Sequence, residues 1–124
     1  MGRFEYEKGF QVAIRAVKQL HPCYPDLRLV LAGDGVYAQT LKQLADTIRS
    51  RPIVMPGYVP NEELPSLLAA ADIFLMPTLR DEGLPMSTLE AMAAGLAPIA
   101  SGAGGMRSVI DHEHNGLLFR MGNV

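Results

Sequence analysis

The sequence predicts an α/β fold: a single layered domain with a doubly wound, Rossmann-like parallel sheet. Apolar residues follow helical spacing in some segments and form short, nearly continuous runs in others. The two patterns alternate along the whole chain, and Gly, Pro or Asp residues close most of the runs. Such alternation is typical of parallel strands joined by right-handed helical crossovers, so ligands are expected at the carboxyl ends of the strands.

The amino-terminal half begins with a helix rather than with a strand. In order, it predicts a helix over residues 9–20, a strand over 27–32, a helix over 41–48 and a strand over 53–55. The run at 27–32 is almost continuously apolar, which is typical of a strand covered on both faces. The Gly-Asp-Gly sequence at 33–35 predicts a strand-to-helix turn, with a direct phosphate contact as the alternative.

The carboxyl-terminal half continues the alternation. In order, it predicts a helix over residues 64–71, a strand over 73–76, a helix over 88–94, a strand over 98–100, a short helical turn over 106–110 and a strand over 117–119. Pro65 is compatible with the first turn of its helix, where its missing N–H would have no partner. Four methionines are expected to fill the core, namely Met76, Met86, Met92 and Met106.

Composition excludes several classes of protein. The chain has 124 residues, 48% of them hydrophobic and 19% charged, which fits one globular domain with its own core. Its net charge is -2 and its Lys and Arg are scattered, so the sequence shows no basic cluster that would indicate binding of nucleic acid. No apolar stretch is long enough for a membrane span. The single Cys23 favours a reducing, cytoplasmic setting, and the histidines are expected on the surface or at caps.

The segment from Met76 to Gly95 carries the chemistry. Glu82 follows an expected strand, a Gly-Leu-Pro turn comes next, and Glu90 lies eight residues later in the following helix. The two carboxylates stand on either side of this tight bend and are expected to converge on one ligand, whose anionic part the unpaired N–H groups of the helix start can face. Two alternatives stay open: Glu82 as a solvated loop acid, and Glu90 as part of a capping box with Ser87.

Five segments in order, GRFEYEKG, AGDG, PGYV, EGLPMSTLEAMAAG and SGAGG, resemble the carboxyl-terminal domain of retaining glycosyltransferases with the GT-B fold, of the GT4 type. The likeness covers essentially the whole chain and is most specific at the Glu82 to Glu90 element. It implies binding of a nucleotide-diphosphate sugar. By position, Glu82 would contact hydroxyls of the donor sugar, Glu90 would hold the ribose diol, and Arg3 and Lys8 would neutralise the diphosphate.

The resemblance extends to the backbone around the donor. Gly57 and Tyr58 would lie at the nucleobase, with plain packing as the other reading of Tyr58. Gly83 would let the backbone approach the donor, and phosphate contacts would come from Leu84 and Met86. Two fixed cations and a helix start can offset the diphosphate charge, so no metal cofactor is expected.

The chain also departs from the family pattern. Pro85 stands in the Glu-Gly loop, where it offers no N–H to a phosphate, and Ser108 stands where the family often has Glu. Gly104 and Gly105 fit either an anion-facing turn or a plain helix start.

The resemblance further implies that residues 1–124 are a fragment. The acceptor domain, the acceptor that it would bind and the first strand of a six-stranded sheet would be absent. The loss of that strand should open a gap or force its neighbours to pair. We expect the isolated chain to be catalytically silent and an exposed sheet edge to favour a homo-oligomer. The alternatives are a non-catalytic nucleotide-binding or structural module, and an NAD-type oxidoreductase, which the missing GxGxxG disfavours.

Overall fold

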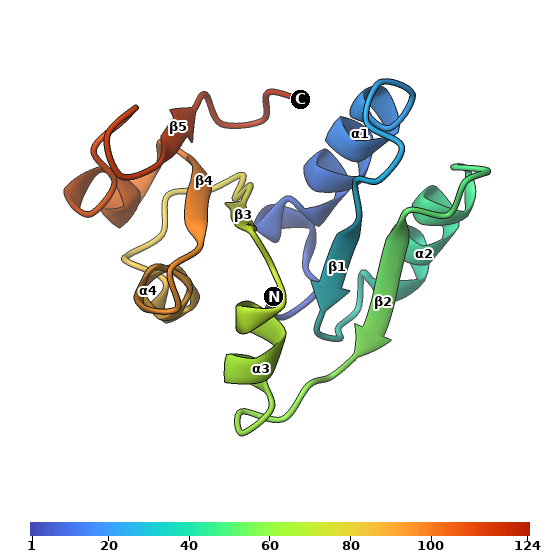
Figure 1. Ribbon diagram of the computed structural model, residues 1–124, viewed down its shortest axis with the longest axis horizontal. Helices are drawn as coiled ribbons and strands as arrows, with labels where there is room; N and C mark the ends of the chain where they lie inside the picture. Colours follow the sequence, from blue (N-terminus) through green and yellow to red (C-terminus); the bar gives the residue numbers. More distant parts are fainter. The chain divides into compact units, whose positions relative to one another are not determined.

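Five parallel strands form two sheets in the computed structural model, which describes residues 1–124. In chain order the elements are 3-10 helix η1 (Tyr6–Lys8), α1 (Phe10–Leu20), β1 (Leu29–Ala32), α2 (Ala38–Asp46), β2 (Ile53–Gly57), α3 (Leu64–Ala69), β3 (Ile73–Met76), α4 (Met86–Ala93), β4 (Ala97–Ser101), 3-10 helix η2 (Gly104–Ser108) and β5 (Leu117–Phe119). Figure 1 shows this order from blue to red. Parallel strands flanked by helices confirm the predicted fold class.

The chain divides into two units, residues 1–59 with Val124 and residues 60–123. The first contains a two-stranded sheet, β1-β2, and the second a three-stranded sheet, β3-β4-β5. Within the units, β1 pairs with β2 and β3 pairs with β4. No helix reaches the length and hydropathy that a bilayer crossing requires.

The core of the first unit lies between its sheet and helices α1 and α2. The helical spacing in the sequence gives each helix one apolar face, and these faces meet alternate residues of the strands. The buried cluster consists of Phe4, Phe10, Ile14, Leu31, Leu41 and Ile48. The rings of Phe4 and Phe10 meet edge to face at 5.0 Å between centroids. Such pairs add to the stabilisation that burial of the rings provides.

The prediction that the strand over residues 27–32 is covered on both faces is wrong. Val30 is 43% exposed, and its register partner Val54 on β2 is 51% exposed. Side chains alternate between the two faces of a strand. Leu29, which precedes Val30, and Met55, which follows Val54, pack against the core cluster. One face therefore meets the helices while the valines of the other face remain accessible.

The Gly-Asp-Gly turn at residues 33–35 brings the amino-terminal segment against the end of β1. The Gly2 N–H donates to the Ala32 carbonyl (2.9 Å), and the Phe4 N–H donates to the Asp34 carbonyl (2.8 Å). A Cβ on Gly33 would overlap the Gly2 carbonyl, and one on Gly35 would lie 2.5 Å from the Phe4 carbonyl oxygen. The predicted turn is confirmed, and it needs glycine because two backbones pass in contact there.

The second unit packs α4 on its three-stranded sheet. The registers are regular: Ile73 lies opposite Ala97 in the β3-β4 pair, and Ile99 lies opposite Leu117 in the β4-β5 pair. Met76 (7% exposed) and Met106 (1%) belong to the core, as expected. The expectation for Met86 is wrong: it is 66% exposed, because it opens α4 on the side away from the sheet-facing residues Thr88 and Ala91.

Candidate functional site

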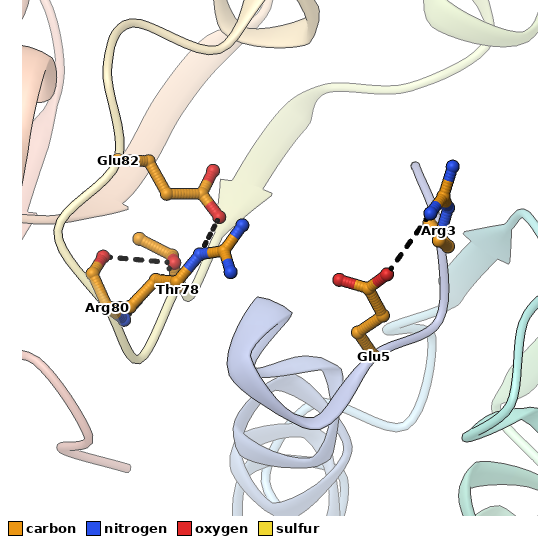
Figure 2. Close-up of polar contacts among 5 residues, drawn as sticks. All are labelled: Arg3, Glu5, Thr78, Arg80 and Glu82. Carbon is orange, nitrogen blue, oxygen red and sulfur yellow. Dashed lines mark hydrogen bonds and ion pairs between the residues drawn. The ribbon is translucent and has the colours of Figure 1, made fainter.

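The loop between β3 and α4 carries Glu82, and its first turn is anchored in the protein interior. Pro77 and Thr78 are both fully buried. The Thr78 hydroxyl donates to the Arg80 carbonyl (3.2 Å) and accepts from the Arg80 N–H (3.4 Å). Side-chain hydroxyls that bond the backbone two residues on stabilise turns of this kind. The backbone of Arg80 is therefore hydrogen-bonded to a buried residue (Figure 2).

The guanidinium of Arg80 is paired with the carboxylate of Glu82. Figure 2 shows the two side chains turned toward each other across the loop, with Nε 3.2 Å from Oε1. The Glu82 side chain is only 11% exposed, whereas that of Arg80 is 48% exposed. The Arg80 guanidinium thus gives this largely shielded carboxylate a counter-charge at hydrogen-bonding distance. Glu82 is therefore not an ordinary solvated loop acid, and that alternative is wrong.

The 3-10 helix η2 holds the same loop from its other side. The Gly104 N–H donates to Asp81 Oδ1 (3.0 Å), and the Gly105 N–H donates to the Glu82 carbonyl (3.1 Å). Gly104 and Gly105 thus form the start of η2, where the Gly104 N–H faces the carboxylate of Asp81 and the Gly105 N–H faces a backbone carbonyl. Nearby, the hydroxyl of Ser108 donates to the Gly105 carbonyl (2.6 Å).

Close contact between the loop and η2 requires both glycines. A Cβ on Gly104 would overlap the Glu82 carbonyl oxygen, and one on Gly105 would lie 2.9 Å from the Leu84 nitrogen. At Gly83, by contrast, a Cβ would meet nothing within 4 Å. The fold therefore demands glycine at the two η2 positions, and no contact within the chain demands it at Gly83.

An open pocket of about 550 Å³ is lined by Arg80, Asp81, Glu82, Gly83, Leu84 and Pro85. Three of the predicted site residues, Glu82, Gly83 and Leu84, therefore lie together. Glu90 and Met86 are exposed on α4 and are not among the residues that line this pocket. The structure thus joins one of the two predicted carboxylates to the pocket, and the expected convergence of both on one ligand stays a prediction.

Helix α4 starts without a side-chain cap. Its N-cap is Pro85, whose extended backbone (φ -65°, ψ 127°) turns directly into the helix. Ser87 is then the second helical residue rather than the cap, so the capping-box reading of Glu90 is wrong. Glu90 lies in the second turn with its side chain accessible to a ligand.

The remaining predicted site residues belong to the first unit. Arg3 is 77% exposed at its side chain, and its Nη1 lies 3.5 Å from Glu5 Oε1 (Figure 2). Lys8 is the last residue of η1 and is half-buried. Gly57 ends β2 with a φ of 84°, and Tyr58 follows it with 73% of its surface exposed. At that exposure Tyr58 makes little packing contact within residues 1–124, and its contact with a nucleobase stays a prediction.

Two of the three histidines, His21 and His112, make local side-chain hydrogen bonds. The Leu118 N–H donates to Nδ1 of His112 (3.0 Å), and Nδ1 of His21 lies 3.2 Å from the Ser50 hydroxyl. Among residues 1–124, no three His, Cys, Asp or Glu side chains lie close enough together to hold a metal ion.

Sequence reasoning missed three residues that shape the loop: Thr78, Arg80 and Asp81. The triplet Arg80-Asp81-Glu82 directly after an expected strand was the available signal, because polar residues at that edge of a parallel sheet tend to serve a site. The partner of Asp81 could not be inferred, since Gly104 lies 23 residues away in the chain.

Comparison with known proteins gives a consistent result. The model of the family described as glycosyl transferases group 1 matches residues 1–124. The 2-deoxystreptamine glucosyltransferase of Streptomyces kanamyceticus is 33% identical over 125 residues, which cover 100% of this chain and 32% of that protein. The chain thus spans about a third of the length of this relative.

Solved structures share the fold. The crystal structure of the C-terminal domain of a glycosyl transferase group 1 family protein (LpcC) from Francisella tularensis has a TM-score of 0.88 and 29% identity, covering 99% of this chain and 66% of that one. Anabaena Alr3699/HepE, crystallised in complex with UDP-glucose, has a TM-score of 0.86 and 27% identity, covering 98% of this chain and 35% of that one.

Proposed function

The chain belongs to the family of glycosyl transferases group 1, and on this premise we propose that residues 1–124 are the carboxyl-terminal, donor-binding domain of such an enzyme. The parent enzyme would move a sugar from a nucleotide-diphosphate sugar to a sugar or lipid-linked acceptor held by a separate amino-terminal domain. The observation that carries this proposal is the pocket at residues 80–85, into which the loop brings the shielded carboxylate of Glu82.

Glu82 is the proposed catalytic residue. A carboxylate accepts hydrogen bonds from sugar hydroxyls, and each such bond to a charged group is worth about 1.5–3 kcal/mol when water is excluded. The loop that carries Glu82 is bonded to the β3 end through Thr78 and to η2 through Gly105. Such anchoring keeps the carboxylate in place before the donor arrives, so little ordering entropy is lost on binding.

Glu90 would hold the ribose diol from the exposed second turn of α4. Acidic residues accept both hydroxyls of a ribose in dinucleotide-binding folds, where the carboxylate bridges the pair. The uncapped start of α4 would face the diphosphate, with backbone N–H groups near Met86 and Leu84 as its donors. Gly83 would let the loop approach the donor, in agreement with the open space beside its Cα.

Arg3 and Lys8 would supply the positive charge that the diphosphate needs. Fixed cations and a helix start stabilise the charge that grows on the phosphate as the glycosidic bond breaks, and this is why no metal cofactor is proposed. Gly57 and Tyr58 would contact the nucleobase, consistent with the exposed ring of Tyr58 at the end of β2.

Transfer with retention of configuration, a cytoplasmic location and assembly into a homo-oligomer complete the proposal. The first rests on the resemblance to retaining enzymes of the GT4 type. The second rests on the single free cysteine, Cys23. The third rests on the edge strands of two small sheets, which can pair with a second chain.

The test is calorimetric binding of UDP-, GDP- and ADP-sugars to the full chain. We expect saturable binding of at least one donor, and we expect Glu90→Gln to weaken it about tenfold by removing the charged acceptor of the ribose hydroxyls. Glu62→Gln is the matched control, because Glu62 is an exposed acid of the same unit outside the site. The proposal fails if no donor binds, or if Glu90→Gln binds as tightly as the unchanged chain does.

A further inference from the structure

Arg80 is the one cation that the pocket lining contains, and its place in the fold is unusual for a surface arginine. Its backbone N–H and carbonyl are both bonded to the hydroxyl of the buried Thr78. A flexible arginine loses much rotamer freedom when it enters an ion pair. Here the two bonds to Thr78 already fix the backbone from which the side chain extends, so the ion pair with Glu82 does not also have to order the loop.

The two side chains of the ion pair differ in solvent exposure, and this difference indicates which of them depends more on the contact. Glu82 is shielded to 11% exposure, whereas Arg80 keeps 48% of its side chain in solvent. Removing a cation from a shielded carboxylate leaves a charge that water compensates poorly, while an exposed guanidinium is readily hydrated. Glu82 therefore gains more from the contact than Arg80 does.

The geometry of the contact also restricts the orientation of the Glu82 carboxylate. A guanidinium is planar, so an Nε–H at 3.2 Å from Oε1 limits the plane in which the carboxylate can lie. The lone pairs of a carboxylate are directional acceptors, and the orientation of the group decides which hydroxyls it can meet. A guanidinium that turned instead to a phosphate would release Glu82 from this orientation.

We propose that Arg80 is a positioning residue for Glu82: it orients the carboxylate toward the sugar of the donor and does not bind the diphosphate. This inference rests on the proposed function, because orientation of Glu82 matters only if Glu82 contacts the sugar. A positioning role for Arg80 differs from a purely structural role in one measurable way. Arg80 should affect the affinity for the nucleotide sugar and not the affinity for the nucleotide diphosphate that lacks the sugar.

The experiment compares each donor with its own nucleotide on the full chain, using UDP with UDP-glucose, GDP with GDP-mannose and ADP with ADP-glucose. For the pair that binds, Arg80→Gln should lower the affinity for the nucleotide sugar about fivefold. The affinity for the nucleotide diphosphate should stay within about twofold of that of the unchanged chain. Arg80→Lys keeps the charge without the planar group, so it should recover part of the loss. Arg120→Gln is the matched control, since Arg120 is an exposed arginine of the same unit.

A double-mutant cycle makes the result independent of small changes in folding. In a Glu82→Gln background, Arg80→Gln should have no further effect on sugar-nucleotide affinity, because the group that it orients is gone. Thermal melting of each variant checks that the chain is folded.

Three results would overturn the inference. The first is an equal loss for nucleotide and nucleotide sugar, which would make Arg80 a phosphate ligand. The second is no change in either affinity, and the third is an undiminished effect of Arg80→Gln in the Glu82→Gln background. If the unchanged chain binds no nucleotide sugar at all, the proposed function fails and this inference fails with it. If the unchanged chain binds a nucleotide sugar and Arg80→Gln does not alter that affinity, only the positioning role is overturned.

Discussion

Replacing Gly104 with alanine tests the contact that joins the pocket loop to η2. Gly104 has a φ of 51°, a left-handed conformation that costs an L-residue about 1–2 kcal/mol. The new Cβ would also overlap the Glu82 carbonyl oxygen and lie 2.8 Å from the Glu82 carbonyl carbon. Because the obstructing atoms are backbone, the loop must shift, and overpacking of this kind costs about 1–3 kcal/mol more.

Displacement of the loop should also weaken the hydrogen bond from the Gly104 N–H to Asp81, worth about 1 kcal/mol. Together these effects predict a loss of about 3–6 kcal/mol in the free energy of unfolding. For a chain of this size the melting temperature should fall by roughly 10 °C or more. Urea unfolding and thermal melting followed by circular dichroism measure both quantities.

Gly83→Ala is the matched control in the same loop. Its Cβ would meet no atom within 4 Å, so the free energy of unfolding should change by less than about 0.5 kcal/mol. If the loop backbone approaches the donor, this variant should nevertheless bind the nucleotide sugar more weakly. A Gly104→Ala chain as stable as the unchanged protein would refute the close approach of loop and η2.

Two further substitutions probe single contacts. Asp81→Asn retains an oxygen acceptor for the Gly104 N–H and should preserve most of the stability, whereas Asp81→Ala should lose about 1–2 kcal/mol in urea unfolding; equal stability of the two variants would contradict the hydrogen bond. Tyr58→Ala removes a ring that is 73% exposed, so melting should be unchanged while calorimetry shows weaker nucleotide binding. A large drop in melting temperature would instead assign Tyr58 to packing.

Local patterns in the sequence were sufficient for most elements of the fold. Helical spacing predicted α1, and the short run at Ile73 to Met76 matches β3 residue for residue. These patterns reflect local constraints, because side-chain periodicity and the fixed φ of proline act within a few residues. The helix predicted over residues 88–94 starts at Met86 in the structure, directly after Pro85, whose fixed φ is compatible with a helix start.

Tertiary structure decided how far the residues of β1 and of the start of α4 are covered. The apolar run of β1 did not reveal that Val30 remains accessible, and the helical spacing around Met86 did not reveal that it faces solvent. The environment of Glu82 likewise depends on Arg80 across the loop and on Gly105, more than 20 residues away in the chain. Exposure and charge pairing are properties of surfaces that meet only after folding, so the order of residues along the chain cannot specify them by local pattern.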